Sequence, residues 1–313
     1  MNKQLALVFP GQGSQSIGML TLWADDPLFR SVVQEASDAI DIDLWQLAQH
    51  GPAERLTDTR LTQPLMVAAG LASWYAWREM GGAVPEVCAG HSVGEITALG
   101  AAQALDLRQA THLVRHRALA MAEAVPAGTA GMAAVLGLQD STVESLCAAC
   151  AQSEVLEPVN YNAPGQVVVA GHLTAIERLK PAAREAGAKM VFVLQVSGPF
   201  HSSLMKPAAQ ALRRYLETLA VREPQFQVLH NCDLSVACAT SIKPALVAHL
   251  TRPVDWVRTV QAMAALGVTH VVELGPGEVL TNLCKRIAPE LTVTAANSPA
   301  SMAAACDAVM SSR

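Results

Sequence analysis

Short apolar runs alternate with longer segments of helical periodicity in the first part of the chain. The run at 4–9 (QLALVF) ends at Pro10 and Gly11, which predicts a buried strand closed by a turn. A second apolar run at 85–90 has the same character. The segments with the length and period of helices lie at 63–80, 96–104 and 106–124. This alternation predicts a parallel sheet covered by helices.

Residues 128–197 follow a different order. Strand, helix, strand, strand, helix and strand succeed one another, with a turn at 162–165 (NAPG) between the middle strands. This βαββαβ order is typical of ferredoxin-like folds. We therefore predict a large α/β domain from 1–127 and 198–313, with a small ferredoxin-like domain inserted at 128–197. The predicted strands of the insert are 130–136, 155–160, 166–171 and 189–196, its helices are 140–150 and 174–186, and the large domain resumes with strands at 225–230 and 270–274 and helices at 278–287 and 298–310.

The composition is that of a well-packed globular protein. Hydrophobic residues make up 51% of the 313 residues and charged residues only 16%, against a usual charged share of about 25%. Much of the chain must therefore face inward. The formal net charge of −5 argues against a nucleic-acid-binding protein, which needs a basic surface.

Cysteine usage and the N-terminal sequence predict a cytoplasmic protein. The seven cysteines are irregularly spaced, which indicates reduced thiols rather than a disulfide framework. Cys147 and Cys150 form a C-x-x-C pair without a second pair for zinc, so we interpret them as helix residues. The apolar run before Pro10 is too short for a secretory signal, and no run is long enough to span a membrane.

The strongest local motif is G-x-S-x-G at 90–94 (GHSVG), between a predicted strand and a predicted helix. The two glycines permit a sharp turn that presents Ser92 as a nucleophile, and the helix N-terminus favours developing negative charge. The loop at 11–15 (GQGSQ) lacks both the third glycine of a dinucleotide fingerprint and a phosphate-binding lysine. It is better interpreted as a tight loop whose N–H groups contribute to an oxyanion hole.

A base and an anion-binding residue complete the candidate chemistry. His201 lies in a turn-rich stretch at 197–202, where it can reach a cleft, whereas His230 lies in no particular motif. A histidine base predicts a rate that changes between mildly acidic and mildly basic pH. Arg117 falls on the apolar face of its helix, so it requires either a substrate anion or an acid from a distant segment.

These motifs resemble those of malonyl-CoA:acyl carrier protein transacylases in order and spacing. Two further segments add to the resemblance, at 160–171 (NYNAPGQVVVAG) and 273–277 (ELGPG). The resemblance covers nearly the whole chain. It implies a hydrolase-like large domain with a ferredoxin-like insert, a malonyl-serine intermediate, and no metal or redox cofactor. It implies Ser92 as nucleophile, His201 as general acid and base, Arg117 as the partner of the malonyl carboxylate, and the N–H groups of Gln12 and Val93 as the oxyanion hole.

The chain departs from the pattern of these transacylases at three positions. Val93 replaces the usual leucine, and Ala118 replaces the usual glycine after the arginine. His249 replaces the glutamine whose main-chain carbonyl orients the catalytic histidine. A carbonyl survives that replacement, while any role of the side chain stays open.

The resemblance predicts malonyl-CoA, coenzyme A and an acyl carrier protein as partners of a monomeric protein that binds neither nucleic acid nor membrane. The expected role is supply of malonyl units for fatty-acid synthesis; polyketide synthesis and malonate decarboxylation use similar subunits. A serine hydrolase or thioesterase and a non-catalytic carrier-binding module are further alternatives. Carrier proteins are acidic, so docking requires a local basic patch, and the candidate residues are Lys189, Lys206, Lys285 and Arg286.

Overall fold

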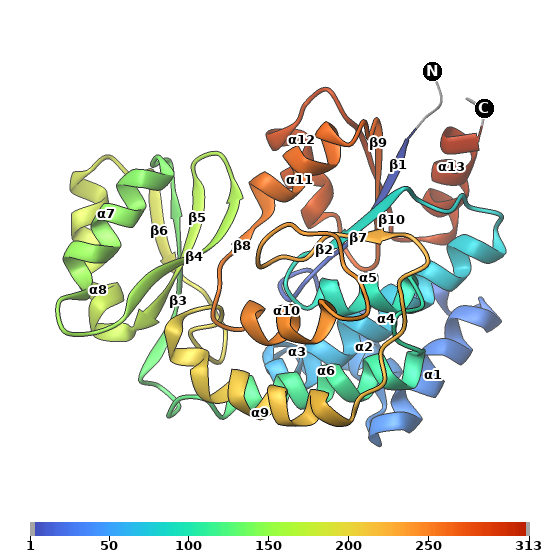
Figure 1. Ribbon diagram of the computed structural model, residues 1–313, viewed down its shortest axis with the longest axis horizontal. Helices are drawn as coiled ribbons and strands as arrows, with labels where there is room; N and C mark the ends of the chain where they lie inside the picture. The colour runs from blue at the N-terminus through green and yellow to red at the C-terminus, as the bar shows by residue number, and fades with distance from the viewer. Residues whose placement is uncertain (1–3, 311–313) are drawn as a thin grey trace.

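In the computed structural model, which describes residues 4–310, β1 (Leu5–Phe9) is the central strand of a parallel sheet (Figure 1). The strand order is β10-β9-β1-β2-β7, and each pairing in it is parallel. The other strands are β2 (Val87–Gly90), β7 (Gln227–Val228), β9 (His270–Leu274) and β10 (Thr292–Ala296). The structure thus confirms a mixed α/β fold with a parallel sheet.

Alternate side chains of β1 enter two different hydrophobic cores. Leu5, Leu7 and Phe9 pack into the larger core, whereas Ala6 and Val8 pack into the smaller one. This alternation follows from the two-residue period of a strand, and burial on both faces explains the continuous apolar run. The larger core is covered by α1 (Pro27–Ile40), α4 (Thr59–Glu79), α5 (Gly94–Ala101), α6 (Leu107–Ala122) and α9 (Lys206–Thr218), and the smaller one by α11 (Trp256–Ala265) and α12 (Val279–Ile287).

A second sheet has the order β6-β3-β5-β4-β8, and its first four strands are drawn in green to yellow at the left of Figure 1. Its first four strands pair antiparallel, and β8 joins the edge parallel to β4. One face of this sheet is covered by α7 and α8, and side chains of the opposite face, such as Met132 and Val168, enter the larger core. The elements are β3 (Ala130–Leu136), α7 (Asp140–Ala151), β4 (Leu156–Ala163), β5 (Gln166–His172), α8 (Leu173–Glu185), β6 (Met190–Val193) and β8 (Val254–Asp255).

The remaining elements complete the large part of the molecule. They are the 3₁₀ turns η1 (Thr21–Trp23) and η2 (Ser203–Met205) and the helices α2 (Leu44–His50), α3 (Ala53–Thr57), α10 (Ile242–His249) and α13 (Pro299–Met310). The predicted strand at 225–230 is reduced to the two residues of β7. Cys147 and Cys150 are buried free thiols of α7, as their interpretation as helix residues requires.

Two other classes of feature, membrane-spanning helices and metal-binding clusters, are absent from residues 4–310. None of the helices there combines the length and apolar character needed to cross a membrane. Nor do three or more His, Cys, Asp or Glu side chains in that range gather in a way that could hold a metal ion.

Candidate active site

Ser92 lies at the tight turn between β2 and α5, and its φ of 53° is in the left-handed region. The flanking glycines make this turn possible. A Cβ atom on Gly90 would lie 1.9 Å from the carbonyl carbon of Gly94, and one on Gly94 would lie 2.2 Å from the carbonyl oxygen of Phe9. The sharp turn that the motif predicts is therefore present, and this elbow holds the Ser92 hydroxyl at the carboxyl end of β2.

His201 is hydrogen-bonded to Ser92 although 109 residues separate them: Nε2 lies 2.7 Å from Ser92 Oγ. On the other side of the ring, Nδ1 lies 2.9 Å from the main-chain oxygen of His249. Because a carbonyl oxygen can only accept, Nδ1 carries the proton and Nε2 is the acceptor for the serine hydroxyl. This is the arrangement that a base needs to activate a hydroxyl nucleophile.

Burial of His201 strongly favours its neutral form. The side chain is 3% exposed. Burial, and then the positive charge of Arg117, lower the pKa of His201 to about 3, against the stabilising hydrogen bond to His249. The imidazole is therefore in its proton-accepting form throughout the mildly acidic and neutral range.

Arg117 lies on the buried face of α6, as its position on the apolar face predicts, and is 1% exposed. Nη2 donates to Ser92 Oγ over 3.3 Å, and Nη1 donates to Gln63 Oε1 over 2.6 Å. No salt bridge found in residues 4–310 includes Arg117. Burial lowers the pKa of Arg117 to about 10, with the negative charge of Glu95 opposing the shift. The guanidinium is thus still charged at neutral pH, and its nearest partners are neutral.

Gln12 and Val93 line the same cavity as Ser92 and His201. Within the described part of the chain, neither backbone N–H has a protein acceptor among the loop and turn hydrogen bonds. Free N–H groups beside a nucleophile are the requirement for an oxyanion hole. The cavity has a volume of about 130 Å³, and its other lining residues are Gln63, His91, Met121, Met132, Asn160, Asn162, Val168, Leu194, Val196 and Phe200.

A buried carboxylate behind the elbow was not predicted from the sequence. Glu95, in the first turn of α5, is hydrogen-bonded to His230 Nδ1 over 2.8 Å and accepts the N–H of Asn231 over 3.0 Å. Asn231 in turn accepts the N–H of Ser92 over 2.9 Å and donates to the carbonyl oxygen of Gly90 over 2.7 Å. Glu95 and Asn231 therefore fix the turn that carries Ser92. The sequence around His230 contains no motif, and its partner Glu95 lies 135 residues away, so the sequence does not indicate this hydrogen bond.

The side chain of His249 also faces Glu95. Its Nδ1 lies 3.3 Å from Glu95 Oε2, and its ring centroid lies 4.8 Å from that of His201. Burial comes first among the causes that hold the pKa of His249 well below its ordinary value, and the electrostatic influence of the neighbouring His201 and Arg117 acts in the same direction. The His249 carbonyl is placed as the resemblance implies, and its neutral ring occupies the space beneath His201.

The sequence matches the acyl transferase domain family over residues 6–306. It is 47% identical over 308 residues to the malonyl CoA-acyl carrier protein transacylase of Escherichia coli (strain K12), an alignment that covers 97% of this chain and 99% of that protein. The corresponding protein of Bacillus subtilis is 37% identical over 299 residues, covering 95% of this chain and 94% of its own. The chain belongs to the malonyl-CoA:acyl carrier protein transacylase family.

Solved structures of this transacylase family have the same fold. An acyl-carrier-protein S-malonyltransferase from Burkholderia pseudomallei superposes with a TM-score of 0.95 at 49% identity, over 97% of this chain and 99% of that one. A malonyl-transacylase in complex with a type II PKS acyl-carrier protein superposes with a TM-score of 0.96 at 44% identity, over 98% of this chain and 100% of that one. The protein is thus an enzyme of the acyltransferase class.

Proposed function

We propose that the protein transfers a malonyl group from coenzyme A to the phosphopantetheine thiol of an acyl carrier protein, supplying malonyl units for fatty-acid synthesis. The observation that carries this proposal is the position of Arg117, a buried cation within hydrogen-bond distance of Ser92 Oγ. A buried guanidinium held by neutral groups favours an anion. A malonyl group presents a carboxylate two bonds from the thioester carbonyl, so both its ends can be held at once.

The reaction proceeds in two half-reactions. His201 Nε2 takes the Ser92 proton while Oγ attacks the thioester carbonyl, and the N–H groups of Gln12 and Val93 bind the resulting oxyanion. The carbon–sulfur bond then breaks, and His201 returns the proton to the sulfur of coenzyme A. The carrier thiol gives its proton to His201 and attacks malonyl-serine, which releases Ser92 with that proton. Each oxyanion-hole donor contributes about 3 kcal/mol in comparable enzymes.

Arg117→Ala is expected to remove the preference for malonyl over acetyl groups. Without the guanidinium beside Ser92, the carboxylate has no cationic partner, because the residues that line the cavity are neutral. We expect malonyl transfer to fall by about 100-fold or more while acetyl transfer changes little. The measurement is carrier acylation from malonyl-CoA and from acetyl-CoA, read by mass for both enzymes.

The matched control is Arg115→Ala, on the same helix, because Arg115 is more exposed and donates to the main-chain oxygen of Arg60. Equal loss with both acyl donors would contradict the carboxylate role of Arg117.

The same assay tests the serine hydrolase alternative. A hydrolase would release free malonate without added thiol, whereas a transferase holds malonyl-serine until a carrier or coenzyme A arrives.

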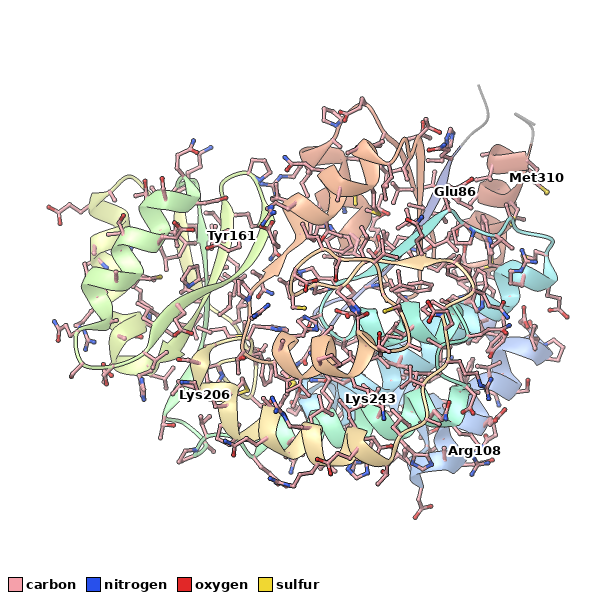
Figure 2. The ribbon with its side chains drawn as sticks, in the orientation of Figure 1. Glu86, Arg108, Tyr161, Lys206, Lys243 and Met310 are labelled. Carbon is pink, nitrogen blue, oxygen red and sulfur yellow. The ribbon has the colours of Figure 1, made fainter. Side chains whose placement is uncertain are left out.

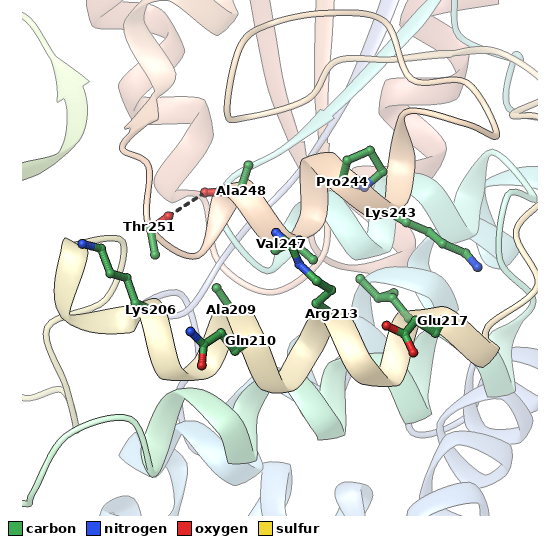
Figure 3. A pocket seen from close by; sticks show the side chains of 11 residues that line it. Lys206, Ala209, Gln210, Arg213, Glu217, Lys243, Pro244, Val247, Ala248 and Thr251 are labelled. Carbon is green, nitrogen blue, oxygen red and sulfur yellow. Dashed lines mark hydrogen bonds between the residues drawn. The ribbon is translucent and has the colours of Figure 1, made fainter.

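The structure brings two of the four candidate docking residues to one hollow. Lys189, just before the edge strand β6 of the second sheet, and Arg286, on α12, line it together with the turn after β4, and Asp140 is the acid among the lining residues. Lys285 precedes Arg286 on α12 and is exposed. Lys206 lies elsewhere, at the start of α9, where it faces a groove between α9 and α10 (Figures 2 and 3).

We propose that the acidic carrier docks at the hollow formed by Lys189 and Arg286. Lys189→Glu is expected to lower kcat/KM for the carrier by about tenfold, because a reversed rim charge weakens electrostatic steering. The rate of malonyl-serine formation from malonyl-CoA should stay unchanged. Lys206→Glu is the matched control, and a loss confined to that variant would place docking at the α9–α10 groove instead.

We also propose that 128–197 is a ferredoxin-like small domain inserted between 1–127 and 198–313. What supports this is the βαββαβ order of β3, α7, β4, β5, α8 and β6 and the antiparallel order β6-β3-β5-β4 of their strands. The pairing of β8 with β4 fixes this unit to the rest of the chain on one side of the cavity.

A further inference from the structure

A chain of hydrogen bonds joins Arg117 to Gln12 through the first turns of α4. Arg117 Nη1 donates to Gln63 Oε1 over 2.6 Å, and Gln63 Nε2 donates to Thr59 Oγ1 over 3.0 Å. Thr59 Oγ1 donates to Gln12 Oε1 over 2.8 Å. The chain therefore connects the residue that binds the malonyl carboxylate with a residue of the oxyanion hole.

The direction of every bond in this chain follows from the guanidinium. Arginine can only donate, so the oxygen of the Gln63 amide must face Arg117 and its nitrogen must face Thr59. The Thr59 oxygen accepts that bond, which leaves its proton for the oxygen of Gln12. A positive charge at one end thus sets the orientation of the Gln12 side chain at the other.

The two linking side chains are fully enclosed and neutral. Thr59 is 0% exposed and Gln63 is 2% exposed, so any unpaired polar atom on them would carry a desolvation penalty. Neutrality also matters for Arg117. A carboxylate in place of the Gln63 amide would form an internal ion pair and compete with the substrate, whereas an amide orients the guanidinium without neutralising it.

We propose that Thr59 and Gln63 are positioning residues that couple recognition of the malonyl carboxylate by Arg117 to the placement of Gln12 in the oxyanion hole. This inference rests on the function proposed above. An acyl group with a free carboxylate fixes Arg117 and, through Gln63 and Thr59, Gln12. An acetyl group leaves Arg117 unengaged, so the relay then adds less to the transition state.

The test is the single-turnover rate of acyl-serine formation, followed by mass, in Thr59→Val. Valine keeps the shape of threonine and removes both the donor and the acceptor. We expect the malonyl rate to fall by about tenfold, the effect of one or two lost hydrogen bonds, and the acetyl rate to fall by no more than about threefold. Thr59→Ser restores the hydroxyl and should recover the malonyl rate.

Thr111→Val is the matched control, because Thr111 is equally buried and its hydroxyl donates to the main-chain oxygen of Leu107 in its own helix. Gln63→Glu gives a second, independent test. It should raise the KM for malonyl-CoA by about 100-fold, since a new carboxylate pairs with Arg117 and repels the substrate, while the acetyl-CoA kinetics change little.

Equal losses of malonyl and acetyl rates in Thr59→Val, or no loss in either, would overturn the relay, as would an unchanged malonyl-CoA KM in Gln63→Glu. Should Thr59→Val fail to fold, Gln63→Glu alone decides between the outcomes. Failure of the proposed function has a different signature: the unsubstituted enzyme would then form no malonyl-serine from malonyl-CoA.

Discussion

Ser92→Ala is expected to abolish formation of a malonyl adduct on the protein. The adduct requires an oxygen at the elbow, and alanine offers none, while the left-handed turn and the hydrogen bond from the Ser92 N–H to Asn231 do not depend on the hydroxyl. Loss of the nucleophile in a comparable serine enzyme lowers the rate by about 10⁶-fold. The measurement is the mass of the intact protein after incubation with malonyl-CoA.

Ser73→Ala is the matched control. Ser73 is a buried serine of α4 whose hydroxyl donates to the main-chain oxygen of Ala69 in the same helix. This hydrogen bond includes none of the proposed catalytic residues. This variant should form the adduct at the normal rate. A malonyl adduct in Ser92→Ala that forms as fast as in the unsubstituted enzyme would show that another group is acylated.

The parts of the site that the sequence predicts are those with a local signal. The spacing of Gly90 and Gly94 around Ser92 encodes a turn that requires glycine at both flanking positions, because backbone atoms occupy the places where their Cβ atoms would be. Arg117 stands out because it interrupts an apolar helix face, and its burial confirms that interpretation. In both cases the physical cause lies within a few residues of the chain.

The parts that the sequence does not predict depend on contacts between distant segments. Gln63 reaches Arg117 across 54 residues, and Asn231 reaches the N–H of Ser92 across 139. An isolated glutamine or asparagine has no spacing that marks its partner. The sequence leaves two alternatives for the partner of Arg117, an acid from a distant segment or a substrate anion. The structure places the neutral amide of Gln63 there instead of an acid, so the positive charge of Arg117 is available to a substrate anion.

The same distinction holds for the fold. The strands of the parallel sheet that are buried on both faces give continuous apolar runs, so the predicted bounds of β1 differ from the observed ones by one residue and those of β2 by two. β8 is two residues long and forms only by pairing with β4. Its partner strand lies about 90 positions earlier in the sequence, and only the folded core brings the two together. Neither periodicity nor turn residues can indicate such a strand.

His201→Ala is expected to lower the rate of malonyl-serine formation by about 10²- to 10⁴-fold, the usual contribution of a general base. The matched control is His116→Ala, because His116 is an exposed histidine of α6 that stacks on Tyr215. An unchanged rate in His201→Ala would remove it as the base.

The pH profile of the unsubstituted enzyme adds a sharper test, and here the structure revises the expectation from sequence. An ordinary histidine base would lose activity as the pH falls through 6.5, the value from which burial lowers the pKa of His201 to about 3. Because a base acts in its neutral form, kcat/KM should stay level through mildly acidic pH. A level profile would argue against an exposed histidine as the base, but it is the profile expected for the buried His201.

Protein stability must be followed alongside this profile. Where the folded pKa is depressed, the unfolded chain binds a proton that the folded chain refuses, so this histidine makes the fold less stable as the pH falls from 6.5 toward 3. A fall in kcat/KM near pH 6.5 with the melting temperature unchanged would contradict a buried neutral base. A fall that follows the melting temperature would instead report loss of the fold, and would leave the assignment of the proton on Nδ1, facing the His249 carbonyl, intact.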